Sequence, residues 1–313
     1  MIINTGQRTD IPAFYSRWFV NRLKAGFVLV RNPYNPQQVT RYRLTPDVVD
    51  FIGFCTKNPA PMLPHMEWLR PFGQYWYVTV TPYGKNIEPH VPDKRLVLES
   101  FRRLSDIVGT DRIGWRYDPI LISAEWPAER HIRAFEFMAK ALAGSTRNVV
   151  ISFIDLYEKT KRNFPEVRSV SPEERLSLGK ALIAIARQHG MTVRPCAEGD
   201  ELAPFGADCG GCMTVPMIER ALGQRLRVPA FSQARSACAC YLGGDIGAYN
   251  TCGHLCRYCY ANASAEAVKA NMKLHDPESP LLIGHLRPGD TVHEAHQESW
   301  IDPQIEMLSL SCT

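Results

Sequence analysis

Apolar, strand-like runs alternate with amphipathic stretches over the first 200 residues of the chain. Seven runs have the apolar content of buried strands: 1–5, 27–31, 49–55, 76–81, 113–117, 149–154 and 191–195. Four intervening stretches repeat apolar residues at three- and four-residue steps: 13–25, 93–108, 128–143 and 172–189. This alternation predicts an α/β fold with a parallel sheet and crossover helices. About seven strands favour a (β/α) barrel or partial barrel over an open sheet.

The composition changes near residue 200. Glycine and cysteine become frequent, and helical periodicity survives only near 215–222 and 263–272. We therefore predict two parts: a (β/α) barrel domain at 1–200 and a cysteine-rich, metal- or iron–sulfur-binding segment at 201–313.

Bulk properties are those of an ordinary globular protein, with 45% hydrophobic and 22% charged residues. The net charge of +4 is compatible with an anionic ligand such as a nucleotide. The basic groups lack interleaved aromatic residues, so the charge pattern gives nucleic-acid binding no support. The chain has no run of about 18 apolar residues and no signal-peptide layout at its start. We therefore expect a cytoplasmic protein without a membrane partner.

Three cysteines follow one another closely in the pattern C-x3-C-x2-C, namely Cys252, Cys256 and Cys259. Thiolates are soft ligands that select zinc, copper(I) or iron–sulfur clusters. Three of them can hold three corners of a [4Fe-4S] cluster and leave the fourth iron open, whereas a closed cluster takes four cysteines. A structural zinc site is the alternative, with His254 as its fourth ligand.

Four more cysteines form two close pairs: Cys209, Cys212, Cys238 and Cys240. Together they would satisfy a structural zinc ion or a second, closed iron–sulfur cluster. A redox pair at Cys209 and Cys212, or buried inert thiols, are the alternatives. Cys55 and Cys196 stand alone, and we interpret both as packed core residues; a catalytic thiol beside the predicted mouth is the alternative.

Polar residues gather where the apolar runs stop, for example at 7–10, 31–33, 56–59, 81–83, 116–119, 155–157 and 196–198. Active sites of (β/α) barrels form at the C-terminal ends of the strands, so we predict a shared polar mouth. Solvated turns are the alternative. The candidate catalytic residues are Asp118, Arg116, Lys57 and Tyr249. The candidate cofactor-binding residues are Arg8, Asp10, Asp155 and Glu198. In this set, the cations would bind anionic groups and the carboxylates would bind ribose hydroxyls or cationic groups.

Several longer motifs resemble an uncharacterised bacterial family, domain of unknown function family 1848. They are Arg8–Pro12 with Phe14-Tyr15, Arg31–Pro33, Thr56–Pro59, Arg116–Pro119, Cys238-Ala-Cys240, Asp245–Tyr249 and Cys252–Asn262. The family resemblance implies a barrel with a C-terminal cysteine cluster similar to that of radical S-adenosylmethionine enzymes. The Tyr-Cys-Tyr ending of the cluster loop is also similar to that of spore photoproduct lyase.

These resemblances imply a radical S-adenosylmethionine-like enzyme with a [4Fe-4S] cluster at Cys252, Cys256 and Cys259. Such an enzyme takes S-adenosylmethionine, an external flavodoxin- or ferredoxin-like electron donor, and here an unknown substrate. The chain departs from the ordinary radical S-adenosylmethionine arrangement in one respect. Its cysteine loop lies near the C-terminal end and must fold back over the barrel mouth. The alternatives are a zinc-dependent barrel hydrolase or lyase, and a zinc-stapled module that binds a nucleotide or nucleic acid.

Overall fold

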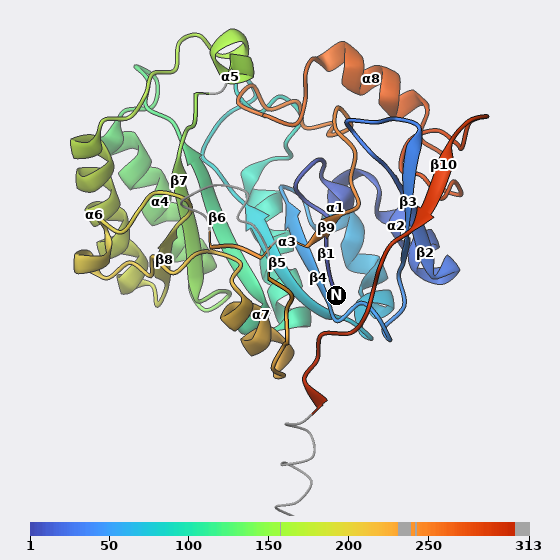
Figure 1. Cartoon of the computed structure of the whole chain (residues 1–313). Coiled ribbons are helices and arrows are strands. Elements are labelled where there is room, and N and C mark those ends of the chain that lie inside the picture. The colour runs from blue at the N-terminus through green and yellow to red at the C-terminus, as the bar shows by residue number, and fades with distance from the viewer. Residues whose placement is uncertain (157, 231–238, 242, 304–313) are drawn as a thin grey trace, which may run out of the picture.

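The computed structural model describes the chain except for residues 157, 231–238, 242 and 304–313. Its main element is a seven-stranded sheet in the order β8-β7-β6-β5-β4-β1-β9, in which all paired neighbours are parallel (Figure 1). The strands are β1 (Ile2–Asn4), β4 (Phe51–Thr56), β5 (Gly73–Thr79), β6 (Ile113–Ile120), β7 (Asn148–Phe153), β8 (Thr192–Pro195) and β9 (Gly244–Asp245). The predicted α/β fold with a parallel sheet is confirmed.

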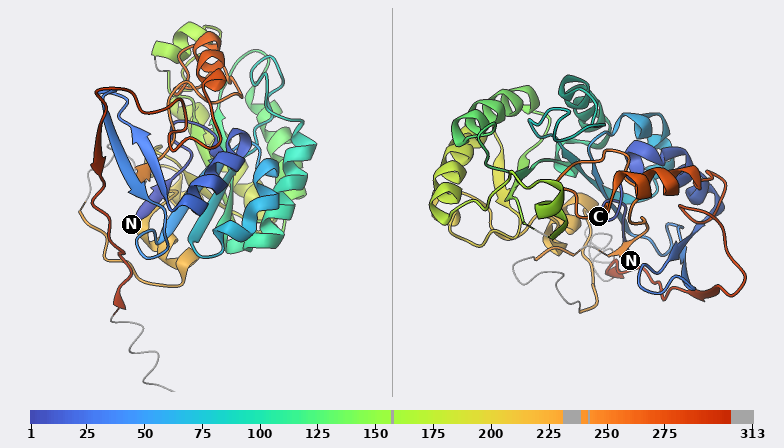
Figure 2. Two further views of the ribbon diagram at one scale, coloured as in Figure 1. Left: turned by 90° about the vertical axis from the view of Figure 1, so that its right-hand side faces the viewer. Right: turned by 90° about the horizontal axis from the view of Figure 1, so that it is seen from above.

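Helices connect the strands of the sheet and cover one of its sides (Figure 2). Helix α3 (Lys94–Val108) joins β5 to β6, and α4 (Ala128–Leu142) joins β6 to β7. The connection from β7 to β8 contains α5 (Glu158–Asn163) and α6 (Pro172–Gln188). Helix α6 begins with a capping box in which Ser171 and Glu174 bond each other's backbone N–H groups. No helix in the described parts of the chain is long and apolar enough to span a bilayer.

The central strands are buried because both faces of the sheet are covered. Six of the seven residues of β5 are buried, as are five of the six in β4. Such continuous apolar strands are typical of parallel sheets packed on both sides. Because all paired strands run parallel, the C-terminal ends of all seven strands lie at one edge of the sheet. Side chains from segments far apart in the sequence come together there.

The predicted strand at 27–31 is a strand, but it does not belong to the main sheet. As β2 (Phe27–Arg31) it pairs antiparallel with β3 (Gln38–Arg43), and β10 (Thr291–Glu294) adds a third strand to this small sheet. The chain reverses directly after β2, so β2 bonds to its neighbour in sequence. The polar residues that follow it are consequently not at the main sheet edge, and Arg31 instead pairs with Asp290 at 2.7 Å.

The seventh strand of the main sheet comes from the C-terminal part of the chain. β9 pairs with β1 through Ile3–Gly244 and Asn4–Asp245. The other described elements are α1 (Ile11–Phe14), α2 (Ser16–Ala25), α7 (Val215–Leu222), α8 (Ala265–Lys273) and the 3-10 helices at Ala60–Leu69, Thr110–Arg112 and Ala203–Phe205. The division of the chain near residue 200 stays a prediction, although β9 places residues of the second part within the main sheet.

Candidate functional site

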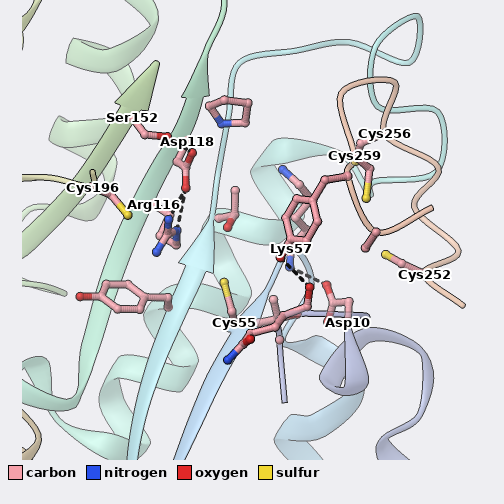
Figure 3. Close-up of a pocket in the computed structure, with 18 of the residues that line it drawn as sticks. Asp10, Cys55, Lys57, Arg116, Asp118, Ser152, Cys196, Cys252, Cys256 and Cys259 are labelled. Atoms are coloured by element: carbon pink, nitrogen blue, oxygen red, sulfur yellow. Dashed lines mark hydrogen bonds and ion pairs between the residues drawn. The ribbon is translucent and has the colours of Figure 1, made fainter. Parts of the chain in front are cut away.

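A cavity of about 350 Å³ lies at the C-terminal edge of the main sheet. Its walls come from the ends of the strands and from the loop that carries the three closely spaced cysteines, residues 252–259, which we call the cysteine loop (Figure 3). Eleven of the predicted site residues line it: Arg8, Asp10, Lys57, Arg116, Asp118, Asp155, Cys212, Cys240, Cys252, Cys256 and Cys259.

The three thiols of the cysteine loop lie on one side of this cavity. A hydrogen bond from the Cys259 N–H to the Cys256 carbonyl, 3.0 Å long, closes a tight turn between the last two cysteines. Leu255 has a φ of 55°, in the left-handed region, which bends the chain just before Cys256. Burial raises the pKa of Cys252 well above its usual range and that of Cys256 to about 12. Both thiols are therefore protonated at neutral pH unless a metal displaces the proton.

Asp10 attaches the cysteine loop to the sheet. Its carboxylate caps helix α1 by accepting from the Ala13 N–H at 3.0 Å, and it accepts from the Lys57 N–H at 2.7 Å. The same carboxylate lies 2.9 Å from Nε2 of His254, which is buried inside the cysteine loop. One side chain thus joins the start of α1, the end of β4 and the loop.

Glu88 makes a second and more strongly charged attachment. It is 1% exposed and accepts from the Lys57 ammonium at 2.8 Å and from the Thr81 hydroxyl at 2.7 Å. Lys94 and the Tyr258 hydroxyl, which belongs to the cysteine loop, also donate to it. Burial alone would favour the neutral acid, but Lys57 and Lys94 outweigh it and lower the pKa of Glu88 to about 2. Glu88 is therefore ionised at neutral pH.

Backbone contacts reinforce the same junction. Nδ1 of His90 lies 2.8 Å from the Gly253 carbonyl, and the His90 N–H donates to the His254 carbonyl at 3.2 Å. The Arg257 N–H donates to the Ile87 carbonyl at 3.0 Å. The segment after β5 therefore positions the cysteine loop along much of its length.

A second polar group faces the cavity from β6 and β7, on the side opposite the cysteine loop (Figure 3). Nε of Arg116 donates to Asp118 at 2.9 Å, and Ser152 also donates to this carboxylate. Burial works against ionisation, but Arg116 and Ser152 outweigh it and lower the pKa of Asp118. The result is an ionised pair with a hydroxyl beside it, suited to binding a polar substrate group.

Beside Arg116, the Cys212 thiol contacts two further thiols. Sγ of Cys212 lies 3.1 Å from Sγ of Cys240 and 3.6 Å from Sγ of Cys196. These three and Cys209 line a second, smaller cavity. Cys238 lies outside the described residues. Within the described ranges, no group of three or more His, Cys, Asp or Glu side chains is placed so that it could hold a metal ion.

Two of the predicted residues, Glu198 and Tyr249, are not among the described residues that line the main cavity. Glu198 lines the smaller cavity and accepts from the Phe153 N–H at 2.7 Å, and burial raises its pKa to about 7. Nε of Arg8 lies 3.8 Å from Asp245, and its guanidinium carbon is 5.6 Å from the centre of the Tyr249 ring.

Sequence reasoning did not identify several residues that shape the site. Glu88 and His90 lie in the irregular segment between β5 and α3, and no motif distinguishes them from solvated loop residues. Ser152 is an ordinary strand position. Cys196 packs against an apolar cluster, as expected, and its thiol also contacts Cys212 at the cavity wall. The position of Cys196 directly after β8, at the predicted mouth, was the one sequence signal that it could belong to the site.

The sequence was compared with known families and proteins. The family model described as Domain of unknown function (DUF1848) matches residues 2–261, most of the chain. That range contains the sheet, both cavities and the cysteine loop. No curated protein matches the sequence. The chain therefore belongs to the DUF1848 family.

Proposed function

We propose that this protein is a radical S-adenosylmethionine-like iron–sulfur enzyme built on a partial (β/α) barrel, with the cysteine loop covering the barrel mouth. One observation carries the proposal: Cys252, Cys256 and Cys259 all line the cavity formed by the strand ends. A metal centre on this loop would face the polar residues at the place where a barrel performs its chemistry.

The residues present fit such a cluster. Three soft thiolates in one loop match the donor set of an iron–sulfur cluster with one open position. Lys57 favours the ionised form of the Cys256 thiol, although burial has the larger, opposite effect on its pKa. When bound, a cluster of this kind supplies reductive cleavage of S-adenosylmethionine to a 5'-deoxyadenosyl radical. A flavodoxin- or ferredoxin-like protein would supply the electron.

The chain's own residues position the cysteine loop, bind the cofactor or substrate, and exclude water. Asp10 and Glu88 position the cysteine loop against the sheet through His254 and Tyr258. The Arg116–Asp118 pair with Ser152 binds a polar group of the cofactor or substrate on the opposite wall. The apolar part of the lining, which includes Phe54, keeps water from the reacting atoms.

The experiment that tests this function starts with protein purified without oxygen and reconstituted with iron and sulfide. Iron, sulfide, zinc and the visible spectrum are measured, and S-adenosylmethionine and dithionite are then added. We expect a brown protein that forms 5'-deoxyadenosine without added substrate. A colourless protein with stoichiometric zinc and no cleavage would overturn the proposal and favour a zinc-dependent hydrolase or lyase.

A matched pair of cysteine variants makes the test specific. Cys256→Ser should lose the cluster iron and 5'-deoxyadenosine formation, because two thiolates do not retain the cluster. Cys55→Ser changes a thiol of the same cavity that lies outside the loop, and it should keep both. Equal loss in the two variants would mean that the iron is not bound at the cysteine loop.

A further inference from the structure

We propose that the chain contains a second, separate metal site. In this site Cys196, Cys212 and Cys240, with Cys209 as the fourth ligand, bind one tetrahedral metal ion of the zinc type. The four thiols come from the end of β8, the 209–212 turn and the segment before β9, and all four line the smaller cavity. The site does not use the cysteine loop, so it does not depend on the function proposed above.

Cys212 makes two close sulfur–sulfur contacts, one of them near the spacing of a tetrahedral thiolate site. With Zn–S bonds of about 2.3 Å, two thiolates of a tetrahedral site lie about 3.8 Å apart. Cys212 has one thiol neighbour at 3.6 Å and another at 3.1 Å. Small side-chain rotations would bring this trio to the spacing of a tetrahedral site.

Two N–H donors point at these sulfurs, as expected for groups that stabilise bound thiolates. The Met213 N–H donates to Sγ of Cys240 at 3.3 Å. Nη1 of Arg116 donates to Sγ of Cys212 at 3.8 Å. A charged donor and a backbone donor both favour the anionic form that a metal ion requires.

The surrounding structure holds the thiol-bearing segments in place. Buried Arg194 bonds the Gly211 carbonyl at 3.0 Å and pairs with Asp208 at 2.6 Å, which fixes the 209–212 turn against β8. Gly211 has a φ of 105°, and a Cβ there would lie 2.9 Å from Thr214. The Tyr241 N–H donates to the Met213 carbonyl at 2.8 Å and joins the Cys240 segment to the turn.

As placed in the described parts of the chain, these sulfurs do not converge on one point. In the thiol form they bond pairwise, with Cys212 between Cys196 and Cys240. A metal ion replaces the thiol protons, removes those S–H contacts and draws the sulfurs to itself. Cys209 stands at the start of the same turn and lines the smaller cavity together with the other three thiols.

The test uses the full chain carrying C252S, C256S and C259S, so that the cysteine loop binds nothing. The reduced, chelator-treated protein is titrated with Co²⁺ and then with Zn²⁺. We expect one Co²⁺ per chain, with the visible bands of a tetrahedral thiolate site, and stoichiometric displacement by Zn²⁺. Adding Cys196→Ser should weaken Co²⁺ binding by about 100-fold or more.

Cys55→Ser in the same background is the matched control, because Cys55 is a partly buried thiol packed against the same apolar cluster. It should leave Co²⁺ affinity and spectrum unchanged. If the triple variant does not fold by circular dichroism, zinc bound to the Cys196→Ser and Cys55→Ser single variants decides the question. Absence of stoichiometric binding, an unaltered spectrum after Cys196→Ser, or a Cys212–Cys240 disulfide that persists in reductant and excludes Zn²⁺ would overturn the proposal.

Discussion

The two cysteine groups at the main cavity are held in place by different forces. The cysteine loop is attached through buried polar groups, with Asp10 beside His254 and the ionised Glu88 beside two lysines and Tyr258. The group around Cys212 lies in an apolar cluster with Met217 and Ile218. Cysteines are therefore held mainly by buried polar and ionised groups on one side, and on the other by apolar packing together with the Arg194–Asp208 pair at the turn.

This difference has a physical consequence for each group. A buried ion pair is sensitive to removal of one partner, because the remaining charge is left without compensation. An apolar cluster has no such sensitivity, and its stability varies little with pH. The predictions below test this contrast in the metal-free, reduced protein.

The largest expected effect comes from Glu88→Gln. The variant should lower the free energy of unfolding by about 3–5 kcal/mol, since two largely buried ammonium groups lose their counter-charge. Urea unfolding measures the change. Glu158→Gln removes the partner of Lys161 at an exposed site and should leave the midpoint unchanged. A small effect of Glu88→Gln would show that charge does not fix the loop.

The second prediction concerns pH. The pKa of Glu88 is lowered to about 2 in the folded state, below its ordinary value of 4.5. Its contribution is therefore present above about pH 4.5 and is lost as pH falls towards 2, with a full size of about 3 kcal/mol. Unfolding free energies from pH 6 to pH 3 should fall less steeply in Glu88→Gln than in the unaltered protein. Parallel curves would contradict the assignment.

A smaller effect is expected from Tyr258→Phe, which removes the one hydroxyl of the cysteine loop that donates to Glu88. The loss should be about 2 kcal/mol, as for a hydrogen bond to a charged group. Combined with Glu88→Gln in a double-mutant cycle, it should be strongly non-additive, because both changes remove one contact. Additive losses would mean that the Tyr258 hydroxyl stabilises the protein through a contact other than the one with Glu88.

The smallest effect should come from the packed side. Tyr77 donates to the Cys212 carbonyl, and Tyr77→Phe should cost about 1 kcal/mol with no change in pH dependence. Tyr34, 89% exposed, provides the control variant Tyr34→Phe. A loss that grew as pH fell would break the contrast between the two groups.

Much of the fold was predictable because strand and helix periodicities are local. Helix α7 occupies the predicted stretch 215–222, and six of the seven predicted strands belong to the main sheet. The prediction that 27–31 belongs to the main sheet was wrong, since an apolar run does not specify which strand it pairs with. β9 has only two residues and no apolar pattern, so its pairing was not predictable.

The candidate site was predictable where a chemical pattern lies in one segment. The three thiols of the cysteine loop and residues from five of the seven predicted strand-end groups line one cavity. Glu88 was not predictable, because its partners Lys57 and Tyr258 lie 31 and 170 residues away in sequence. Cys196 shows the same limit, since only the folded chain brings it to Cys212.

The pairing of β9 with β1 affects how the chain is made. The two strands are about 240 residues apart, so the outer edge of β1 has no partner until β9 leaves the ribosome. At roughly 5–20 residues per second, this wait lasts on the order of ten to fifty seconds. An unpaired parallel edge invites association with other chains. A pause in translation between β8 and β9 would prolong that exposure, so aggregation of nascent chains should depend on codon choice in that interval.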